Sequence, residues 1–411
     1  MENLEQKIVD ILQAKHIKGK RIALYGCSNE TSILLDAIKK ADLEVEILFV
    51  LDGDFRKNHS LYDGVEVRLP KEAISENKDL TVIIWSLHAD EMIASVREYL
   101  LPKEQIIHID IRRDSVLYLE YQIDRINKAL KEFETVRKHT EHYCLLAPVA
   151  SGDIYIALAF LEEWKRKNRV ADITLIGSGR NIKDIADLYE VKSVEIINDK
   201  TRKDLVFLSS VLGGQIWLKM LSPWELNIRN TFFPSGRSRN TFVEKYQYEV
   251  FELERNSRPV YPSMSGKYNG QTRKAVIAPY AYSSPAPQLS KEIWSDIAAV
   301  IASRGYRVFT VGYGDKEPAI AGTTLIQFTY KEIPDIFGEN DLFIAERNGL
   351  CDIMHNSPCN KLILFSNAKN NYAMDLYGLR NNYPDFIGEE LLVSRDNDEK
   401  IVETVIQKLS I

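Results

Sequence analysis

Three runs of alternating strand and helix patterns follow one another along the chain, and this repetition limits the folds open to it. The first run begins at residues 20–41, where an apolar stretch passes through a glycine turn into an amphipathic helix. Further apolar stretches at 44–54, 79–86 and 105–111 supply the next strands. Alternating strands and helices build a mainly parallel sheet with helices on both faces. We therefore predict an α/β protein.

The second and third runs repeat the pattern after a long amphipathic helix. The second opens at "YCLLAPVASGD", residues 143–153, and the third at "KAVIAPYAYSSPAPQ", residues 274–288. A polar stretch rich in Arg, Asn, Ser and Pro separates them. We predict three Rossmann-like units, divided into an accessory domain at 1–115, a connector helix at 116–141, and two facing domains at 142–265 and 266–411 with a ligand cleft between them.

Composition excludes several classes of protein. The 411 residues are 45% hydrophobic and 27% charged, with a formal net charge of −6, which is typical of a soluble globular protein and argues against a nucleic-acid binder. The four cysteines include no C-x-x-C pair, so neither a zinc site nor a disulfide framework is expected. Because no apolar run reaches the ~20 residues that span a bilayer, we predict a cytoplasmic protein and leave membrane-surface contact and self-association open.

Asp153 follows a glycine where an apolar strand stops and a helix begins. Parallel strands end at the edge of the sheet where ligands bind in open α/β folds, so the carboxylate is a candidate general base. Alternatively, Ser151 or Asp153 caps the helix, since both residue types do this well.

A second group of polar residues lies in "DLFIAERNGLCDIMH". Gly349 would let the backbone approach a ligand, the helix start would favour a diphosphate, and Arg347 would add a charge-assisted contact beside Asn348. The alternatives are an Asn-Gly turn with a surface arginine and, for His355, a packing role.

Loops at other strand ends face the same predicted cleft. They offer hydroxyls for phosphate, glycines for close approach and an acid for a sugar hydroxyl, at Ser283, Ser284, Gly312, Gly314 and Asp315. As polar turns they would need no ligand. The segment "NIRNTFFPSGRSRN" gathers Arg229, Arg237 and Arg239, which form either a solvated loop or a contact with an anionic acceptor.

The glycine-containing turns "YGCSNETS" and "IGSGRN" do not complete the G-x-G-x-x-G fingerprint. A dinucleotide oxidoreductase centred on the first domain, with the cofactor near Gly26 and Asp52, remains an alternative. We favour a structural or regulatory role for that domain.

The segment "SGDIYIALAFLEEWKRK", the tryptophan-bearing helix "SKEIWSDIAAVIASRG" and the motif "RNGLCDIMH" together resemble bacterial heptosyltransferase-like enzymes of glycosyltransferase family 9. The resemblance covers residues 142 to 411. It implies a GT-B arrangement in which 142–265 binds the acceptor, 266–411 binds a nucleotide-sugar, and Asp153 is the base of an inverting, metal-independent transfer in cell-surface glycan biosynthesis. The donor phosphates then fall near Ser283, Ser284, Asn348 and Gly349, and His355, which approximates the family's downstream histidine, is counted among the donor-binding residues.

Two departures from that family bear on the donor. The loop "SSPAPQ" lacks the family's phosphate-binding lysine, so that contact is absent or supplied elsewhere, for example by Arg347, and "RNGLCD" also resembles a strand-end motif of fucosyltransferase-like GT-B enzymes. No cofactor is implied, and the acceptor is a glycan, lipid-linked or protein hydroxyl. The rival functions are a nucleotide-sugar epimerase and a non-catalytic protein that binds a nucleotide-sugar.

Overall fold

The computed structural model describes most of the chain as two compact units, Met1–Lys128 (unit 1) and Ala129–Ile411 (unit 2). The described residues are 3–54, 57–86, 88–99, 102–113, 115–179, 181–226, 240–264, 273–281, 289–313, 315, 317–365, 372–393 and 398–408. Within this part of the chain, no helix is long and apolar enough to cross a membrane.

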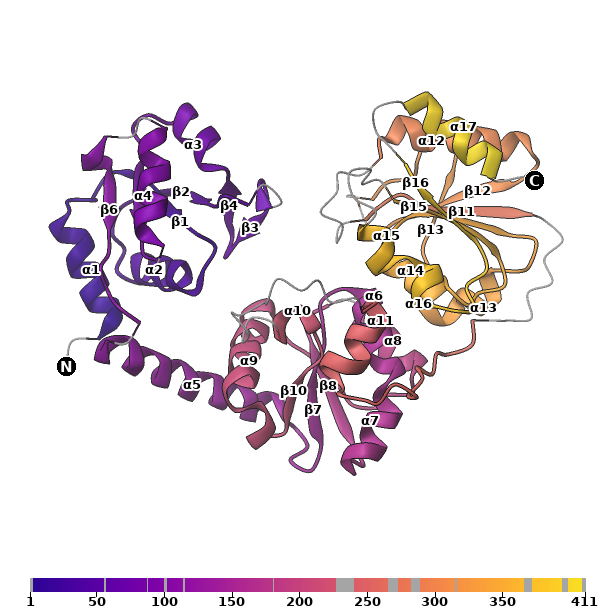
Figure 1. Ribbon diagram of the computed structural model, residues 1–411, viewed down its shortest axis with the longest axis horizontal. Helices are drawn as coiled ribbons and strands as arrows, with labels where there is room; N and C mark the ends of the chain where they lie inside the picture. The colour runs from indigo at the N-terminus through magenta and orange to yellow at the C-terminus, as the bar shows by residue number, and fades with distance from the viewer. Residues whose placement is uncertain are drawn as a thin grey trace. The chain divides into compact units, whose positions relative to one another are not determined.

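Unit 1 contains a six-stranded sheet in the order β3-β4-β2-β1-β5-β6, parallel except for the short β3–β4 pair. Its strands are β1 (Arg21–Tyr25), β2 (Glu46–Leu51), β3 (Leu61–Tyr62), β4 (Val65–Arg68), β5 (Thr81–Ile84) and β6 (Ile106–His108). The helices that cover it are α1 (Leu4–Ala14), α2 (Asn29–Lys40), α3 (Pro70–Glu76) and α4 (Ala89–Glu98), as Figure 1 shows.

Alternation along β1 explains why this sheet is covered on both faces. Ile22 and Leu24 belong to a core with α1 and α2, whereas Ala23 and Tyr25 belong to a separate core with α3 and α4. Successive side chains of a strand point to opposite faces, so the buried apolar run Ile22–Tyr25 requires helices on both.

The predicted connector is a 21-residue helix, α5 (Val116–Val136). The boundary between the two units lies inside this helix, after Lys128. Its apolar residues Leu117, Tyr118 and Tyr121 pack against the core of unit 1, and Ala129 and Phe133 are buried.

The first half of unit 2 is a four-stranded parallel sheet in the order β10-β7-β8-β9. Its strands are β7 (Tyr143–Leu146), β8 (Ile173–Gly177), β9 (Val194–Ile196) and β10 (Leu218–Met220). Its helices are α6 (Ser151–Ala159), α7 (Leu161–Asn168), α8 (Ile182–Leu188), α9 (Asp199–Leu212), α10 (Pro223–Leu226), α11 (Phe242–Lys245) and a π-helix, Tyr246–Val250.

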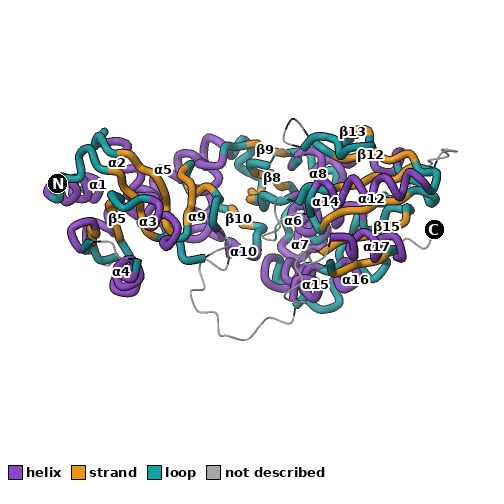
Figure 2. The backbone as a smooth tube through the Cα atoms, turned by 90° about the horizontal axis from the view of Figure 1, so that it is seen from above, coloured by secondary structure: helices purple, strands orange, loops and turns teal. Residues whose placement is uncertain are grey.

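The second half of unit 2 is a six-stranded parallel sheet in the order β13-β12-β11-β14-β15-β16. Its strands are β11 (Lys274–Ala278), β12 (Arg307–Val311), β13 (Thr324–Ile326), β14 (Leu342–Glu346), β15 (Asn360–Phe365) and β16 (Glu389–Leu392). Its helices are α12 (Lys291–Ser303), α13 (Ile333–Ile336), α14 (Gly349–Met354), α15 (Tyr372–Tyr377), α16 (Leu379–Asn382) and α17 (Asp398–Lys408). Figure 2 shows α12 and α17 beside the strands of this sheet.

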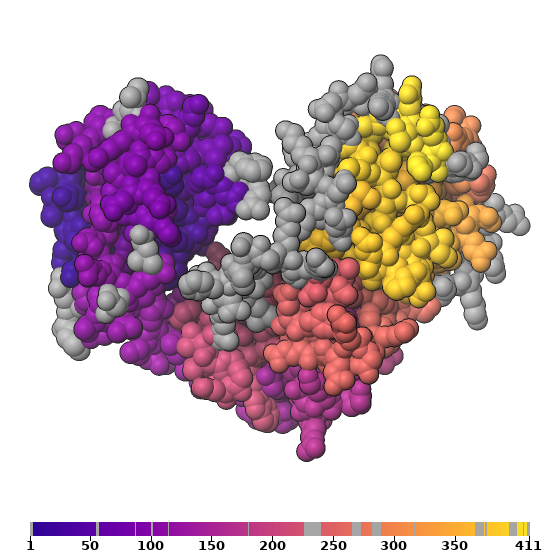
Figure 3. Space-filling model, viewed as in Figure 1, coloured from indigo at the N-terminus to yellow at the C-terminus, as the bar shows by residue number. Residues whose placement is uncertain are grey.

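One hydrophobic cluster runs through both halves of unit 2. It includes Leu145 and Ile154 from the first half and Val276 and Ile353 from the second. A separate hydrophobic cluster under α12 and α17 covers the other face of the last sheet. In Figure 3 the C-terminal residues, in yellow, form a continuous surface on the side of the viewer. The predicted α/β class with parallel sheets is confirmed.

In each sheet the strand order reverses direction beside the first strand. The reversals lie between β1 and β5, between β7 and β10, and between β11 and β14. Such switch points open a crevice outside the carboxyl ends of the two strands, which is where open α/β sheets bind ligands. Asp153 follows β7, and Arg347 follows β14.

Candidate active site

The turn from β7 into α6 places Asp153 in the first turn of the helix. The residue before the helix is Ala150, and it makes no side-chain capping bond. Ser151 and Asp153 thus lie inside the helix, and neither holds its N-cap position. The Asp153 carboxylate still receives a hydrogen bond from its own backbone N–H in this first turn. Asp153 is partly exposed, and it lies on a helix whose residues Ile154–Ala159 are all buried.

Tyr246 holds the Asp153 carboxylate. Its hydroxyl donates a hydrogen bond of 2.8 Å to Asp153 Oδ1, and the tyrosine is fully buried. Thr241 and Glu244 form a capping box that starts α11, and the chain then widens into the π-helix that carries Tyr246. Single-turn π segments are rare in proteins as a whole, but those that occur are frequently found at functional sites.

The environment of Asp153 suits a proton acceptor. Burial raises the pKa of its carboxyl to about 6, the Tyr246 hydrogen bond opposes the rise, and the charge of Asp352 adds to it. A general base works best with a pKa near the operating pH. At pH 7 this carboxylate is mostly ionised and able to accept a proton.

Asn348 caps α14 and closes its start. Its side-chain oxygen accepts from the backbone N–H groups of Leu350 and Cys351 at 3.0 and 3.3 Å. Its amide donates to the carbonyl of Tyr280, 3.2 Å away, and so connects the carboxyl ends of β14 and β11. Two of the N–H groups expected to bind a diphosphate, those of Leu350 and Cys351, are therefore already bonded to this side chain.

Two glycines bring α6 and α14 into contact. A Cβ added to Gly349 would lie 2.6 Å from the nitrogen of Gly152, and one added to Gly152 would lie 2.3 Å from Asp352 Oδ2. The close approach predicted for Gly349 is thus an approach to the backbone of α6. The two halves of unit 2 touch where the sequence predicted a cleft.

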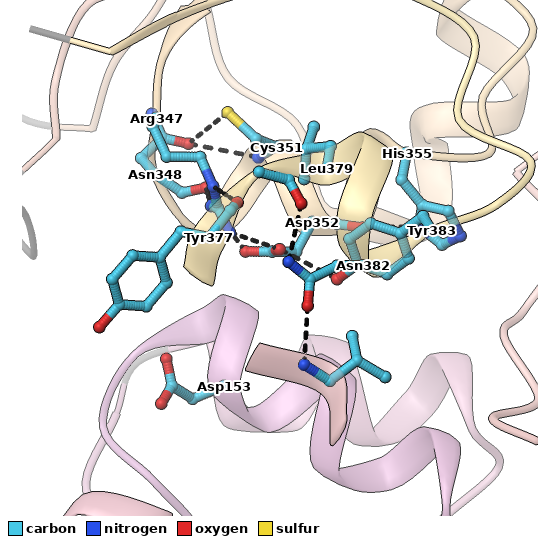
Figure 4. Close-up of polar contacts among 12 residues, drawn as sticks. Asp153, Arg347, Asn348, Cys351, Asp352, His355, Tyr377, Leu379, Asn382 and Tyr383 are labelled. Carbon is cyan, nitrogen blue, oxygen red and sulfur yellow. Dashed lines mark hydrogen bonds and ion pairs between the residues drawn. The ribbon is translucent and has the colours of Figure 1, made fainter. Parts of the chain in front are cut away.

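Arg347 forms a buried ion pair with Asp352 (Figure 4). Its two terminal nitrogens donate to the two Asp352 oxygens at 2.7 and 2.8 Å, and its Nε donates to the Tyr377 carbonyl at 3.0 Å. Tyr383 donates a further bond of 2.9 Å to Asp352. Burial raises the pKa of Asp352, whereas Arg347 and Tyr383 favour its charged form. Arg347, the residue predicted to contact phosphate, is therefore not an exposed cation, because its charge is balanced by Asp352.

His355 occupies an aromatic cluster and is 4% exposed. Its ring stacks on Tyr383 at 4.0 Å and meets Tyr261 edge-on at 4.6 Å, and its Nδ1 lies 2.7 Å from the Asp352 carbonyl oxygen. Burial lowers the pKa of His355 to about 4. This is the arrangement of a neutral packing histidine.

The remaining predicted residues are placed as follows. A Cβ on Gly312 would lie 2.2 Å from the Glu317 carbonyl oxygen, so the close packing of the loop after β12 already requires a glycine at this position. Asp315 is exposed. The others lie outside the described residues: Ser283, Ser284, Gly314, Arg229, Arg237 and Arg239.

Sequence reasoning missed Tyr246, Asp352 and Tyr383. A T-x-x-E capping box at 241–244 was readable, but nothing local connects Tyr246 with a carboxylate from another part of the fold. Asp352 stands five residues after Arg347 on a helix start, and this spacing was a usable sign of a local ion pair.

In unit 1, Asp52 follows β2, which is separated from the switch point by β1. Its carboxylate accepts from Lys57 Nζ at 2.7 Å and from the backbone N–H groups of Asp54 and Cys27 at 2.9 and 3.1 Å. Gly26 has a φ of 103°, which a glycine adopts without strain. The acid that could bind a ribose is thus already hydrogen-bonded within the protein.

Within the described residues, one group has metal-ligand chemistry. His139, Glu141 and His142 bring their ligand atoms within 4.8 Å of one another before β7, at the opposite end of that strand from Asp153. The two imidazoles stack at 4.5 Å with an angle of 27°. Since a metal lies in the plane of each ring that binds it, stacked rings do not converge on one ion.

Comparisons with known proteins give likenesses of fold. No protein-family model matches the chain, and no curated protein is similar to it in sequence. Similar solved structures include E. coli ADP-heptose LPS heptosyltransferase II, with 11% identity and a TM-score of 0.41 over 66% of this chain and 100% of that one. E. coli heptosyltransferase WaaC with ADP is 9% identical, with a TM-score of 0.41 over 64% and 99% of the two chains.

A glycosyl transferase family 9 structure from Veillonella parvula is 11% identical, with a TM-score of 0.40 over 66% and 91% of the two chains. The E. coli heptosyltransferase TibC, described as dodecameric and iron-containing, is 14% identical, with a TM-score of 0.39 over 63% and 65%. These are enzymes of the kind that the sequence motifs resemble. Likenesses at this identity and TM-score carry no argument about the chemistry of this chain.

Proposed function

We propose that unit 2 is an inverting, metal-independent glycosyltransferase that moves a sugar from a nucleotide-sugar to an acceptor hydroxyl. The observation that carries this proposal is the setting of Asp153. Its carboxylate lies beside the switch point of the four-stranded sheet of unit 2, its pKa is raised to about 6, and the hydroxyl of Tyr246 holds it. Its raised pKa and partial exposure favour proton transfer over a structural charge.

In this mechanism the acceptor oxygen attacks the anomeric carbon from the face opposite the leaving diphosphate. The new glycosidic C–O bond forms as the C–O bond to the phosphate breaks, and the electron pair of the broken bond leaves with the diphosphate. The acceptor proton passes to Asp153. Tyr246 holds the carboxylate in place during this transfer, and the anomeric configuration inverts.

The second half of unit 2 supplies the donor site of the proposal. Asn348 ties the end of β14 to the loop after β11, which is the loop that continues to Ser283 and Ser284. Arg347 and Asp352 fix the start of α14 beside that loop. We assign Arg347 a positioning role, because its charge is balanced by Asp352, and leave the phosphate contacts to the loop hydroxyls.

The test is a donor screen followed by product analysis. Nucleoside diphosphates and NAD(P) are ranked by thermal shift, where a ligand at 100 times its Kd should stabilise the protein by about 2.7 kcal/mol. Nucleotide-sugars of the best base are then incubated with candidate acceptors, with and without EDTA, and the anomeric configuration is determined by NMR.

Inversion that is insensitive to EDTA supports the proposal. Retention of configuration, or loss of activity in EDTA, would reject the mechanism. A sugar changed in configuration but still attached to its nucleotide would identify an epimerase, and a shift with NAD(P) alone would identify a dinucleotide-binding protein.

A further inference from the structure

Trp224 is an exposed aromatic side chain at the switch point of the first sheet in unit 2. It lies in α10, directly after β10, and 41% of its surface is exposed. β10 pairs in parallel with β7, whose carboxyl end leads to Asp153. Trp224 and Asp153 therefore stand at the carboxyl ends of the two strands that flank the crevice.

Neighbours from one helix cover one side of the Trp224 ring. Phe242 stacks with it at 6.2 Å and 19°, and Lys245 Nζ lies 5.6 Å from the ring centroid. Both neighbours belong to α11. We call the 41% of the Trp224 side chain that stays exposed beside them its outer face.

The rings lead from Trp224 to the candidate base. Phe242 contacts Tyr246 at 5.5 Å, and the Tyr246 hydroxyl holds Asp153 at 2.8 Å. Tyr377, from the second half of the unit, lies 6.4 Å from Trp224 and 5.1 Å from Phe242, and its carbonyl accepts the bond from Arg347. Trp224 thus lies beside both halves of the candidate site.

We propose that the outer face of Trp224 binds a sugar ring of the acceptor, which makes the acceptor a glycan. A pyranose presents a face of C–H groups ringed by hydroxyls, and a tryptophan offers a large apolar face with a polar edge. Isolated exposed apolar residues are normal on protein surfaces; the location at the switch point, joined through two rings to Asp153, is what indicates a ligand. This inference rests on the proposed function and names its acceptor class.

The chain contains a matched control. Of its five tryptophans, Trp85, Trp164 and Trp294 are 1–4% exposed, and Trp217 is 48% exposed. Trp217 precedes β10, at the opposite end of the strand from Trp224. It stacks on Tyr143 at 6.4 Å, and the Arg137 guanidinium lies 5.7 Å from the centroid of its ring. Replacing it leaves Trp224 as the exposed tryptophan.

The test measures protection of tryptophan fluorescence from acrylamide in the Trp217→Phe protein. The probes are chitotetraose, cellotetraose and maltotetraose, with glycerol phosphate and a serine-rich peptide as non-glycan probes. We expect at least one oligosaccharide to protect Trp224. By calorimetry, Trp224→Ala in the native background should bind that oligosaccharide about tenfold more weakly or worse, and Trp217→Ala should bind it as the native protein does.

Protection by the peptide or by glycerol phosphate alone, no protection by any oligosaccharide, or unchanged affinity in Trp224→Ala would overturn the glycan assignment. Binding is measured without donor, so it is independent of transfer. An oligosaccharide that needs Trp224 but is never glycosylated would reject the transferase and keep the subsite. If transfer occurs and Trp224→Ala leaves its rate unchanged, the transferase is kept and the sugar subsite at Trp224 is rejected.

Discussion

Asp52 and Asp153 both stand at the carboxyl ends of parallel strands, in two different sheets, and their surroundings differ. Asp153 follows β7, which flanks the point where the strand order reverses, whereas Asp52 follows β2, one strand away from that point in its own sheet. Asp52 accepts hydrogen bonds from a lysine and two backbone N–H groups, whereas Asp153 has the Tyr246 hydroxyl as its side-chain donor. Burial acts to raise the pKa of Asp52, but its donors outweigh burial and the pKa lies below its usual value. Burial wins at Asp153, where the pKa rises to about 6.

The comparison shows that a carboxylate at a strand end is not a base by virtue of its position. The number and charge of its hydrogen-bond donors decide whether it stays permanently ionised or titrates near neutral pH. Lys57 makes Asp52 a structural anion. The neutral phenol of Tyr246 orients Asp153 without fixing its charge.

The largest expected effect is on catalysis. Asp153→Asn should lower kcat/KM for transfer by about 10²–10⁴-fold, because the base is lost while the shape is kept. Asp52→Asn should leave kcat/KM within about twofold, as expected for a change away from the site. Both are measured with the donor found in the screen. A loss in Asp52→Asn equal to that in Asp153→Asn would place the chemistry in unit 1.

A third aspartate extends the comparison to a buried pair. Asp352→Asn should reduce the free energy of unfolding of unit 2 by about 3–5 kcal/mol, because it leaves the Arg347 guanidinium buried without a counter-charge. Urea unfolding measures this loss. Asp335→Asn, at an exposed position on α13, is the control and should change stability by less than about 0.5 kcal/mol. Equal, small effects would mean that the pair is open to solvent.

The pH dependence of stability should have opposite signs at the two strand-end aspartates. Because the folded pKa of Asp153 is about 6, above its ordinary value of 3.8, ionisation between these values costs stability. As pH rises through this window, the free energy of unfolding of Asp153→Asn should therefore increase relative to that of the native protein, by roughly 1–3 kcal/mol. The folded pKa of Asp52 is lowered, so Asp52→Asn should be destabilising at neutral pH and lose that effect as pH falls below about 4. Unfolding midpoints from pH 3 to 8 test both signs, and parallel curves would refute the contrast.

The smallest expected effect concerns Tyr246. Its hydrogen bond lowers the pKa of Asp153, so Tyr246→Phe should move the acid limb of the kcat/KM profile to higher pH by up to about one unit. Tyr383→Phe removes a comparable bond from Asp352 and should leave the limb in place. If both variants move the limb equally, Tyr246 does not act through Asp153.

The sheets could be predicted from the sequence because apolar periodicity is local. The runs around 20–54, 143–179 and 274–314 each contain their own strand and helix signals. Asp153 could be singled out for the same reason, since a strand, a glycine and an acid stand together in the chain. The confirmed α/β class rests on these local patterns.

The contacts that give those residues their roles could not be predicted in this way. Tyr246 reaches Asp153, and Gly152 meets Gly349, from segments far apart in sequence. The expectation of an exposed Arg347 and a ligand-binding His355 assumed that the strand end was open. Instead, Asp352 and three tyrosines close around these residues, and only the packed fold brings those groups together.

The contact between Gly152 and Gly349 also bears on how unit 2 folds. During synthesis the first sheet and α6 emerge before α14 exists, and the apolar residues Ile154–Ala159, all buried in the finished fold, then lack part of their cover. Because one hydrophobic cluster contains residues of both halves, each half is stabilised by the other. We therefore expect a chain that ends after residue 265 to expose α6 and aggregate. Although unit 2 has two sheets, it should fold as one cooperative body that completes itself only when the last strands have been made.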